Sequence, residues 1–161
     1  SELEFSWDNL AAAQVRLKRL VHAVGALRGR PAQAGGASTD TYREQLDAAV
    51  SDDLNTARAL PVLDALLADK KVSPANRLAA LADFDAVLGL GLTDLTREAL
   101  RVRPAAATIG PDEIEARLAD RHEARAAKDF PRSDAIRDEL AAAGVEVMDG
   151  DPLGWDWKVT L

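Results

Sequence analysis

Four basic side chains recur at helical spacing in the last third of the chain. They are Arg117, Arg121, Arg125 and Lys128, separated by four, four and three residues. Residues three and four apart lie on the same face of a helix, so these side chains form one basic face, which Arg132 extends beyond the next turn. Guanidinium groups bind phosphates and base edges. The row therefore predicts a surface that could bind nucleic acid.

The same spacing also suits a solvated helix face held by ion pairs. Acidic residues lie among the basic ones, and Glu113 stands four residues before Arg117, which is the offset of an intrahelical ion pair. Spacing alone favours this second interpretation. Residues 112–161 contain 7 Lys or Arg against 13 Asp or Glu, a net charge of −6. This acidity argues against nucleic acid, because affinity for phosphates comes largely from Lys and Arg.

Aromatic residues close to the basic row support the first interpretation. Phe130, Trp155 and Trp157 follow it in the sequence, and aromatic rings stack on unpaired bases. The alternative is that the rings fill the core of a hairpin, which we expect for at least one tryptophan. The role of Trp157 as a stacking residue or a core residue stays open.

No set of residues predicts catalysis. The adjacent Asp52 and Asp53 point in different directions on a helix and are better explained as a helix break with capping side chains. The sequence has no glycine-rich phosphate loop, no cysteine, and only His22 and His122 as histidines. We expect no catalytic residue, no bound cofactor and no metal in this chain.

The apolar spacing predicts a mainly α fold, an antiparallel helical bundle followed by a small helix–helix–β-hairpin module. Two short strands should flank the turn 149–154, the first with Val145 and Val147 and the second with Trp155, Trp157 and Val159. We divide the chain into a bundle (1–103), a linker (104–111) and the C-terminal module (112–161). Helices are expected at 8–28, 39–50, 54–68, 74–88, 112–128 and 130–143.

Helix ends are marked by capping residues. Asp8, Ser73 and Asp129 are expected N-caps, and Gly89 and Gly144 are expected to end helices. No apolar run reaches the roughly 20 residues that span a bilayer, and the acidic start lacks the apolar region of a signal peptide. We therefore expect a cytoplasmic monomer. The absence of methionine at Ser1 favours a trimmed fragment of a longer chain.

Several segments together resemble one family. The pattern at 114–130 and 133–140, followed by Gly144-Val145, Asp149-Gly150, Gly154 and Trp157, is similar to the C-terminal end of bacterial cysteinyl-tRNA synthetases. Residues 5–7, 52–60 and 81–90 resemble earlier segments of the same family, in the same order. Each segment is short, but their order makes the resemblance specific.

This resemblance implies a DALR-type helical bundle that lies along the tRNA, followed by a domain that reads the GCA anticodon of cysteine tRNA. The family's catalytic domain, with its zinc and its ATP-binding signatures, has no counterpart here, so the expected partners are cysteine tRNA and that domain. Carried over by position, the anticodon contacts are Arg125, Phe130, Asp134 and Asp149. Arg121, Lys128 and Trp157 join them as candidates for tRNA binding.

The sequence departs from the family pattern in places. Pro131 follows Phe130 unexpectedly, Asp151 resembles an insertion, and residues 155–158 replace a more basic tail. One alternative is a stand-alone module that binds another protein through its helices. A second alternative, a piece of the ligase that joins cysteine to an amino-sugar pseudodisaccharide, is disfavoured because that enzyme lacks the final helix–helix–hairpin.

Overall fold

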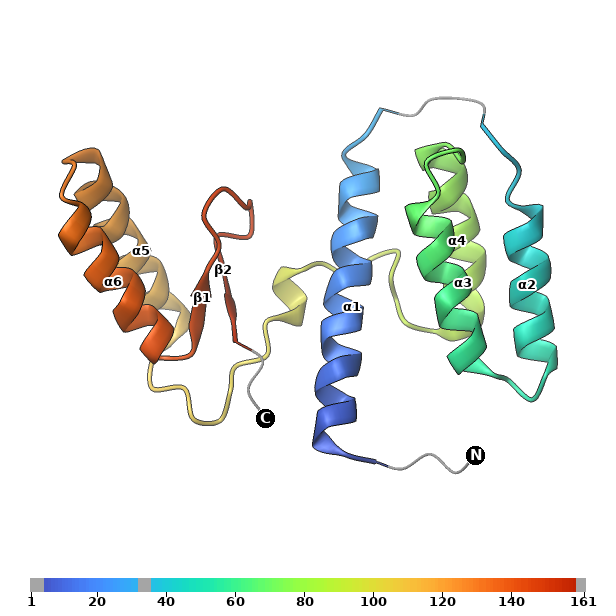
Figure 1. The fold of residues 1–161 in the computed structure, drawn as a ribbon, viewed down its shortest axis with the longest axis horizontal. Helices are drawn as coiled ribbons and strands as arrows, with labels where there is room; N and C mark the ends of the chain where they lie inside the picture. Colours follow the sequence, from blue (N-terminus) through green and yellow to red (C-terminus); the bar gives the residue numbers. More distant parts are fainter. Residues whose placement is uncertain (1–4, 32–35, 159–161) are drawn as a thin grey trace. The chain divides into compact units, whose positions relative to one another are not determined.

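The computed structural model describes residues 5–31 and 36–158 and confirms the mainly α fold (Figure 1). The described part of the chain divides into two compact units. One runs from Arg16 to Ala99, and the other combines residues 5–15 with residues 100–158. Val159 of the predicted second strand lies outside the described residues. The elements, in order, are α1 (Trp7–Arg28), α2 (Asp40–Ser51), α3 (Thr56–Ala68), α4 (Pro74–Leu88), a 3₁₀ turn (Glu98–Leu100), α5 (Pro111–Ala126), α6 (Phe130–Ala142), β1 (Val145–Val147) and β2 (Trp155–Trp157).

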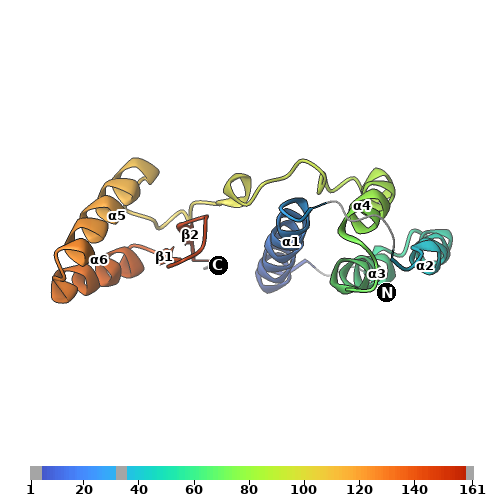
Figure 2. The ribbon, with the colours of Figure 1, turned by 90° about the horizontal axis from the view of Figure 1, so that it is seen from above.

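Helices α2, α3 and α4 run side by side (Figures 1 and 2). Their ends follow the predicted capping at two positions. The Ser73 hydroxyl accepts from the Asn76 amide at 3.2 Å at the start of α4, and Gly89 ends that helix with a φ of 65°. Each cap satisfies backbone groups that the helix itself leaves without partners. None of the helices in the described part of the chain is long and apolar enough to cross a membrane.

The start of α3 differs from the prediction. Asp53 and Leu54 take left-handed backbone conformations, with φ values of 56° and 51°, so the helix begins at Thr56 instead of residue 54. Asn55 is its N-cap and accepts from the Arg58 amide at 3.1 Å. Leu54, predicted on the apolar face, is 71% exposed. The predicted helix break at Asp52 and Asp53 is confirmed, but the capping side chain is that of Asn55, whereas the Asp52 carboxylate pairs with the Arg58 guanidinium.

The start of α1 also differs from the prediction. Ser6 caps the helix by accepting from the Asn9 amide at 3.1 Å, whereas Asp8 lies inside the first turn. The predicted apolar face is buried only from Leu20 onward, and Leu10 is 47% exposed. The buried half of α1 therefore contributes to the core of the Arg16–Ala99 unit, together with α3 and α4 residues such as Phe84.

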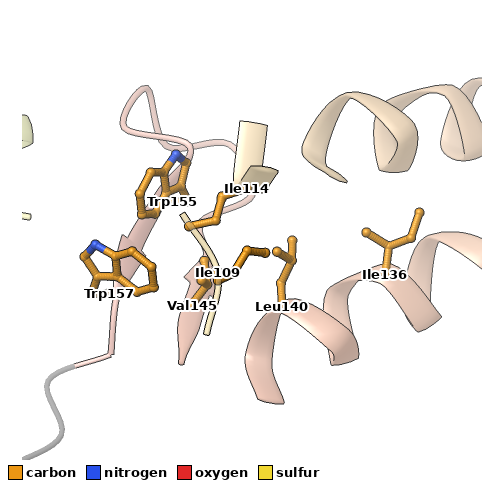
Figure 3. Close-up of a cluster of buried hydrophobic side chains, with 7 residues drawn as sticks. All are labelled: Ile109, Ile114, Ile136, Leu140, Val145, Trp155 and Trp157. Atoms are coloured by element: carbon orange, nitrogen blue, oxygen red, sulfur yellow. The ribbon is translucent and has the colours of Figure 1, made fainter. Parts of the chain in front are cut away.

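In the C-terminal module, α5 and α6 lie side by side and a two-stranded antiparallel hairpin follows them (Figures 1 and 2). Val145 pairs with Trp157, and Val147 pairs with Trp155. A hairpin of two strands is marginal in water by itself, and this one is stabilised by packing on the helices. Figure 3 shows the shared core, made of Ile109, Ile114, Ile136, Leu140, Val145, Trp155 and Trp157.

The segment before α5 packs into this core. Ile109, placed in the predicted linker, is 8% exposed, and the Arg103 guanidinium donates to the Ile109 and Ala107 carbonyls at 3.2 and 2.8 Å. Arg101 donates to the Trp155 and Leu153 carbonyls at 3.2 and 2.6 Å. The domain limits at residues 103 and 112 stay predictions. Removing Arg101 and Arg103 would break these contacts, so the effect on the stability of the C-terminal module tests the limit at residue 103.

Candidate nucleic-acid interface

Two arginines of α5 meet one carboxylate of the hairpin turn. Arg121 donates through both terminal nitrogens to Asp149, with Nη1 2.7 Å from Oδ1 and Nη2 2.8 Å from Oδ2. Arg125, one helical turn later, donates to Asp149 Oδ2 at 3.3 Å. The spacing of four residues places both guanidinium groups on the same helix face. Because the hairpin core is packed on α5, Asp149 is held beside that face.

The members of this cluster differ in exposure. The Arg121 side chain is 7% exposed, whereas Asp149 and Arg125 are 56% and 50% exposed. Hydrogen bonding to Arg121 is the main cause that lowers the pKa of Asp149, with smaller contributions from the charges of Arg121 and Arg125. The same bond raises the pKa of Arg121, and the Asp134 charge adds to this effect. The carboxylate is thus ionised at neutral pH and open to solvent on one side.

The turn that carries Asp149 is closed by its own hydrogen bonds. The Asp151 amide donates to the Met148 carbonyl at 3.1 Å, and the Gly154 amide donates to the Asp151 carbonyl at 2.9 Å. The Asp151 side chain accepts from the Leu153 amide at 2.8 Å. Gly150 has a φ of 78°, a backbone conformation that favours glycine. Asp149 therefore projects from a defined turn.

Lys128 lies outside α5, which ends at Ala126 and not at residue 128 as predicted. Lys128 has a φ of 58°. Its amide donates to the Arg125 carbonyl at 3.0 Å, and the Asp129 amide donates to the Ala124 carbonyl at 2.8 Å. This is the Schellman pattern, in which the left-handed position is usually glycine. The structure therefore takes Lys128 off the helical row and places it in the turn between the two helices.

Phe130 begins α6 directly after this turn and is 60% exposed. Asp129 is the N-cap, as predicted, and accepts from the Arg132 amide at 3.1 Å. Proline in the first turn of a helix loses no hydrogen bond, so Pro131 fits here. The Phe130 ring is therefore accessible from solvent.

Asp134 lies one turn further along α6, where its carboxylate is 60% exposed and stands 3.6 Å from Arg137. Because its charge contributes to the raised pKa of Arg121, Asp134 belongs to the electrostatic surroundings of the arginine–carboxylate cluster. Arg117 pairs with Glu139 of α6 at 3.5 Å. Within the basic row, Arg117 is thus paired with α6, whereas Arg121 and Arg125 are paired with the hairpin turn.

Trp157 does not lie on this surface. It is 3% exposed, and its ring meets that of Trp155 edge-to-face at 5.4 Å (Figure 3). The open choice between stacking residue and core residue is therefore answered in favour of the core, because neither face of a buried ring is available to a nucleotide.

Two contacts that support the hairpin were not predicted. The Trp155 Nε1 group donates to Glu115 at 2.6 Å, and the Arg101 guanidinium lies over the Trp155 ring, 4.1 Å from its centre. Arg101 and Trp155 are 54 residues apart, so no spacing rule connects them. In the described residues, 5–31 and 36–158, no group of three His, Cys, Asp or Glu residues could hold a metal ion.

Comparison with known proteins gives a consistent result. Residues 110–152 match the family model described as cysteinyl-tRNA ligase anticodon binding domain. A cysteine–tRNA ligase of Novosphingobium aromaticivorans is 57% identical over 99% of this chain and 33% of its own length. One from Zymomonas mobilis is 41% identical over 98% of this chain and 37% of its own length. The chain spans about a third of the length of the curated relatives it matches.

Proposed function

Because residues 110–152 belong to the cysteinyl-tRNA ligase anticodon binding domain family, we propose that the chain is the tRNA-binding C-terminal part of a cysteine–tRNA ligase. Its C-terminal module reads the GCA anticodon of cysteine tRNA. The observation that carries this proposal is the exposed Asp149 carboxylate, held between Arg121 and Arg125 on the segment that the family model covers.

The exposed groups suit unstacked bases. Proteins read single-stranded RNA by stacking bases on aromatic rings and by hydrogen bonding to base edges. The Asp149 and Asp134 carboxylates accept from amino and imino groups of bases, Arg125 donates to a base or a phosphate, and Phe130 offers a stacking face. Lys128 lies in the adjoining turn, where it attracts a phosphate.

Aminoacylation is assigned to a catalytic domain outside this chain. In this proposal that domain holds the ATP and the zinc, while the present chain has no catalytic residue and no cofactor and acts as a monomer in the cytoplasm. The chain contributes affinity and anticodon specificity, so that the substrate of the catalytic domain is the correct tRNA.

The acidic module limits the affinity of the chain alone. Residues 112–161 carry a net charge of −6, so the attraction of phosphates rests on a few exposed cations such as Arg125 and Lys128. We expect weak binding that falls steeply with salt, because neutralised phosphates release counterions. Specificity is less affected than affinity, since base edges are read by acceptors as well as by cations.

The test is footprinting of cysteine tRNA with the whole chain and with its Arg125→Ala and Asp134→Ala variants. Arg58→Ala is the matched control, because Arg58 is also an exposed arginine paired with an aspartate, Asp52, but lies in the other unit. We expect protection of the anticodon loop, retained in the control and lost in both test variants. An unprotected anticodon loop, or protection of that loop that both test variants retain, would contradict the proposal.

A second candidate, a module that binds another protein through its helices, is favoured by one observation. The first half of α1 exposes apolar side chains, with Trp7 65% and Val15 54% exposed, and Phe5 adds a 68% exposed ring 5.4 Å from Trp7. Large apolar groups gathered on a surface indicate an interaction site. NMR titration with cysteine tRNA separates the two candidates, because only the first predicts shifts of the anticodon-stem resonances.

A further inference from the structure

We propose that Arg121 is a positioning residue, which fixes the orientation of the Asp149 carboxylate for a base edge, while the longer Arg125 contact is the one exchanged when RNA binds. This inference rests on the anticodon-reading function proposed above. It assigns different roles to two arginines that share one helix face and one carboxylate.

Burial removes Arg121 from direct contact with RNA. Its side chain is 7% exposed, both terminal nitrogens are engaged by Asp149, and its Nε is buried without a hydrogen-bond partner. A guanidinium has five N–H donors in a fixed plane, and in Arg121 the donors with partners all point to one carboxylate. The side chain therefore acts on a nucleotide only through Asp149.

The carboxylate has acceptor positions left for a ligand. Its two oxygens offer about four lone-pair sites in total. Arg121 uses one site on each oxygen, and Arg125 uses one more on Oδ2 at 3.3 Å. If Arg125 turns to a phosphate, both oxygens keep one site for donors on a base edge. Asp149 is 56% exposed, so these sites are accessible.

The two arginine contacts differ in strength. A paired bidentate contact is short and fixes the plane of the carboxylate, as found for Arg121. The Arg125 contact is single and longer, and that side chain is 50% exposed, so moving it costs less. The geometry thus points to a fixed Arg121–Asp149 pair and a mobile Arg125.

The test is a double-mutant cycle on anticodon discrimination. The ratio of dissociation constants for cysteine tRNA with a changed and an unchanged anticodon is measured for the whole chain, for Arg121→Gln, for Asp149→Asn and for the double variant. We expect each single variant to lose about tenfold in this ratio, and the double variant to lose no more than Asp149→Asn. A purely structural role of Arg121 would instead lower the ratio further in the Asp149→Asn background.

Two more variants keep the test decisive. Arg121→Lys retains the charge but cannot hold both carboxylate oxygens in one plane, so it should lose discrimination as Arg121→Gln does, and it carries the test if Arg121→Gln does not fold. Arg58→Gln, at an exposed arginine that pairs with Asp52 in the other unit, should leave the ratio unchanged.

Two failures can be told apart. A wild-type chain without anticodon preference overturns the proposed function and this inference with it. A wild-type chain with a preference that Arg121→Gln and Arg121→Lys both retain overturns the inference alone.

Discussion

Arg121 and Asp149 are 28 residues apart in the sequence, yet their side chains form two hydrogen bonds of 2.7 and 2.8 Å. The pair joins α5 to the hairpin turn, so the orientation of a surface carboxylate depends on the packing of a core that contains Ile114, Leu140 and Trp155. The anticodon specificity proposed for the C-terminal module is thus linked to the stability of that module.

The Asp149 carboxyl gives a pH-dependent stability. Its folded-state pKa is lowered from 3.8, mainly by the bond from Arg121. A lowered pKa stabilises the folded state above the unfolded pKa, and this contribution is lost as the pH falls through the folded pKa. Urea unfolding of the wild type at several pH values from neutral to below 3.8 should therefore show a decline that Asp149→Asn reduces. An identical decline in both proteins would contradict this account of the ion pair.

Lys128→Gly should stabilise the protein and weaken RNA binding at the same time. Its left-handed backbone costs roughly 1 kcal/mol for a side chain other than glycine, so the free energy of unfolding should rise by up to about that amount. Loss of one phosphate contact should reduce the salt dependence of binding, with a slope smaller by about 0.7 for single-stranded RNA.

Leu54→Gly is the matched control for Lys128→Gly, because Leu54 is also left-handed and is 71% exposed. It should change stability in the same direction without changing affinity for tRNA. If Lys128→Gly leaves binding and its salt slope unchanged, Lys128 makes no phosphate contact.

Phe130→Ala should weaken tRNA binding with little effect on folding. The ring is 60% exposed, so its removal should change the free energy of unfolding by no more than about 0.5 kcal/mol. A stacked base contributes roughly 1–3 kcal/mol, which is at least a fivefold loss of affinity in a titration. Val87→Ala, at another exposed apolar position, 54% exposed, should leave affinity unchanged. Equal affinities of Phe130→Ala and wild type would remove Phe130 from the site.

Arg101→Ala should destabilise the C-terminal module. Its guanidinium stacks on Trp155 and donates to two hairpin carbonyls, so its loss should cost about 1–3 kcal/mol. A polypeptide that starts at residue 104 should show a similar loss in thermal unfolding, whereas one that starts at residue 100 should not. Equal stability of the two polypeptides would support the domain limit at residue 103.

Much of the fold was predictable because its signals are local. Ser73-Pro74, Gly89, Asp129 and Gly144 set helix ends through their own backbone and side-chain chemistry. Errors arose where a left-handed turn interrupts an apolar or basic pattern, as at Leu54 and Lys128. Spacing continues through such a turn, although the helix does not.

The candidate site was predictable only in part. Helical spacing brings Arg121 and Arg125 together, but their contact with Asp149 depends on how the hairpin packs on α5, which no local pattern specifies. The resemblance to a family supplied Asp149 and Asp134 as candidates. It did not distinguish the buried Arg121 from the exposed Arg125, or the buried Trp157 from the exposed Phe130, because burial follows from tertiary packing.

The most direct test of the central claim is a titration of the whole chain, at low salt, with cysteine tRNA and with the same tRNA carrying a changed anticodon. Reading of the anticodon by this surface predicts tighter binding of the unchanged tRNA by about tenfold or more, and loss of that preference in Asp149→Asn. Equal affinities for the two tRNAs would contradict the claim.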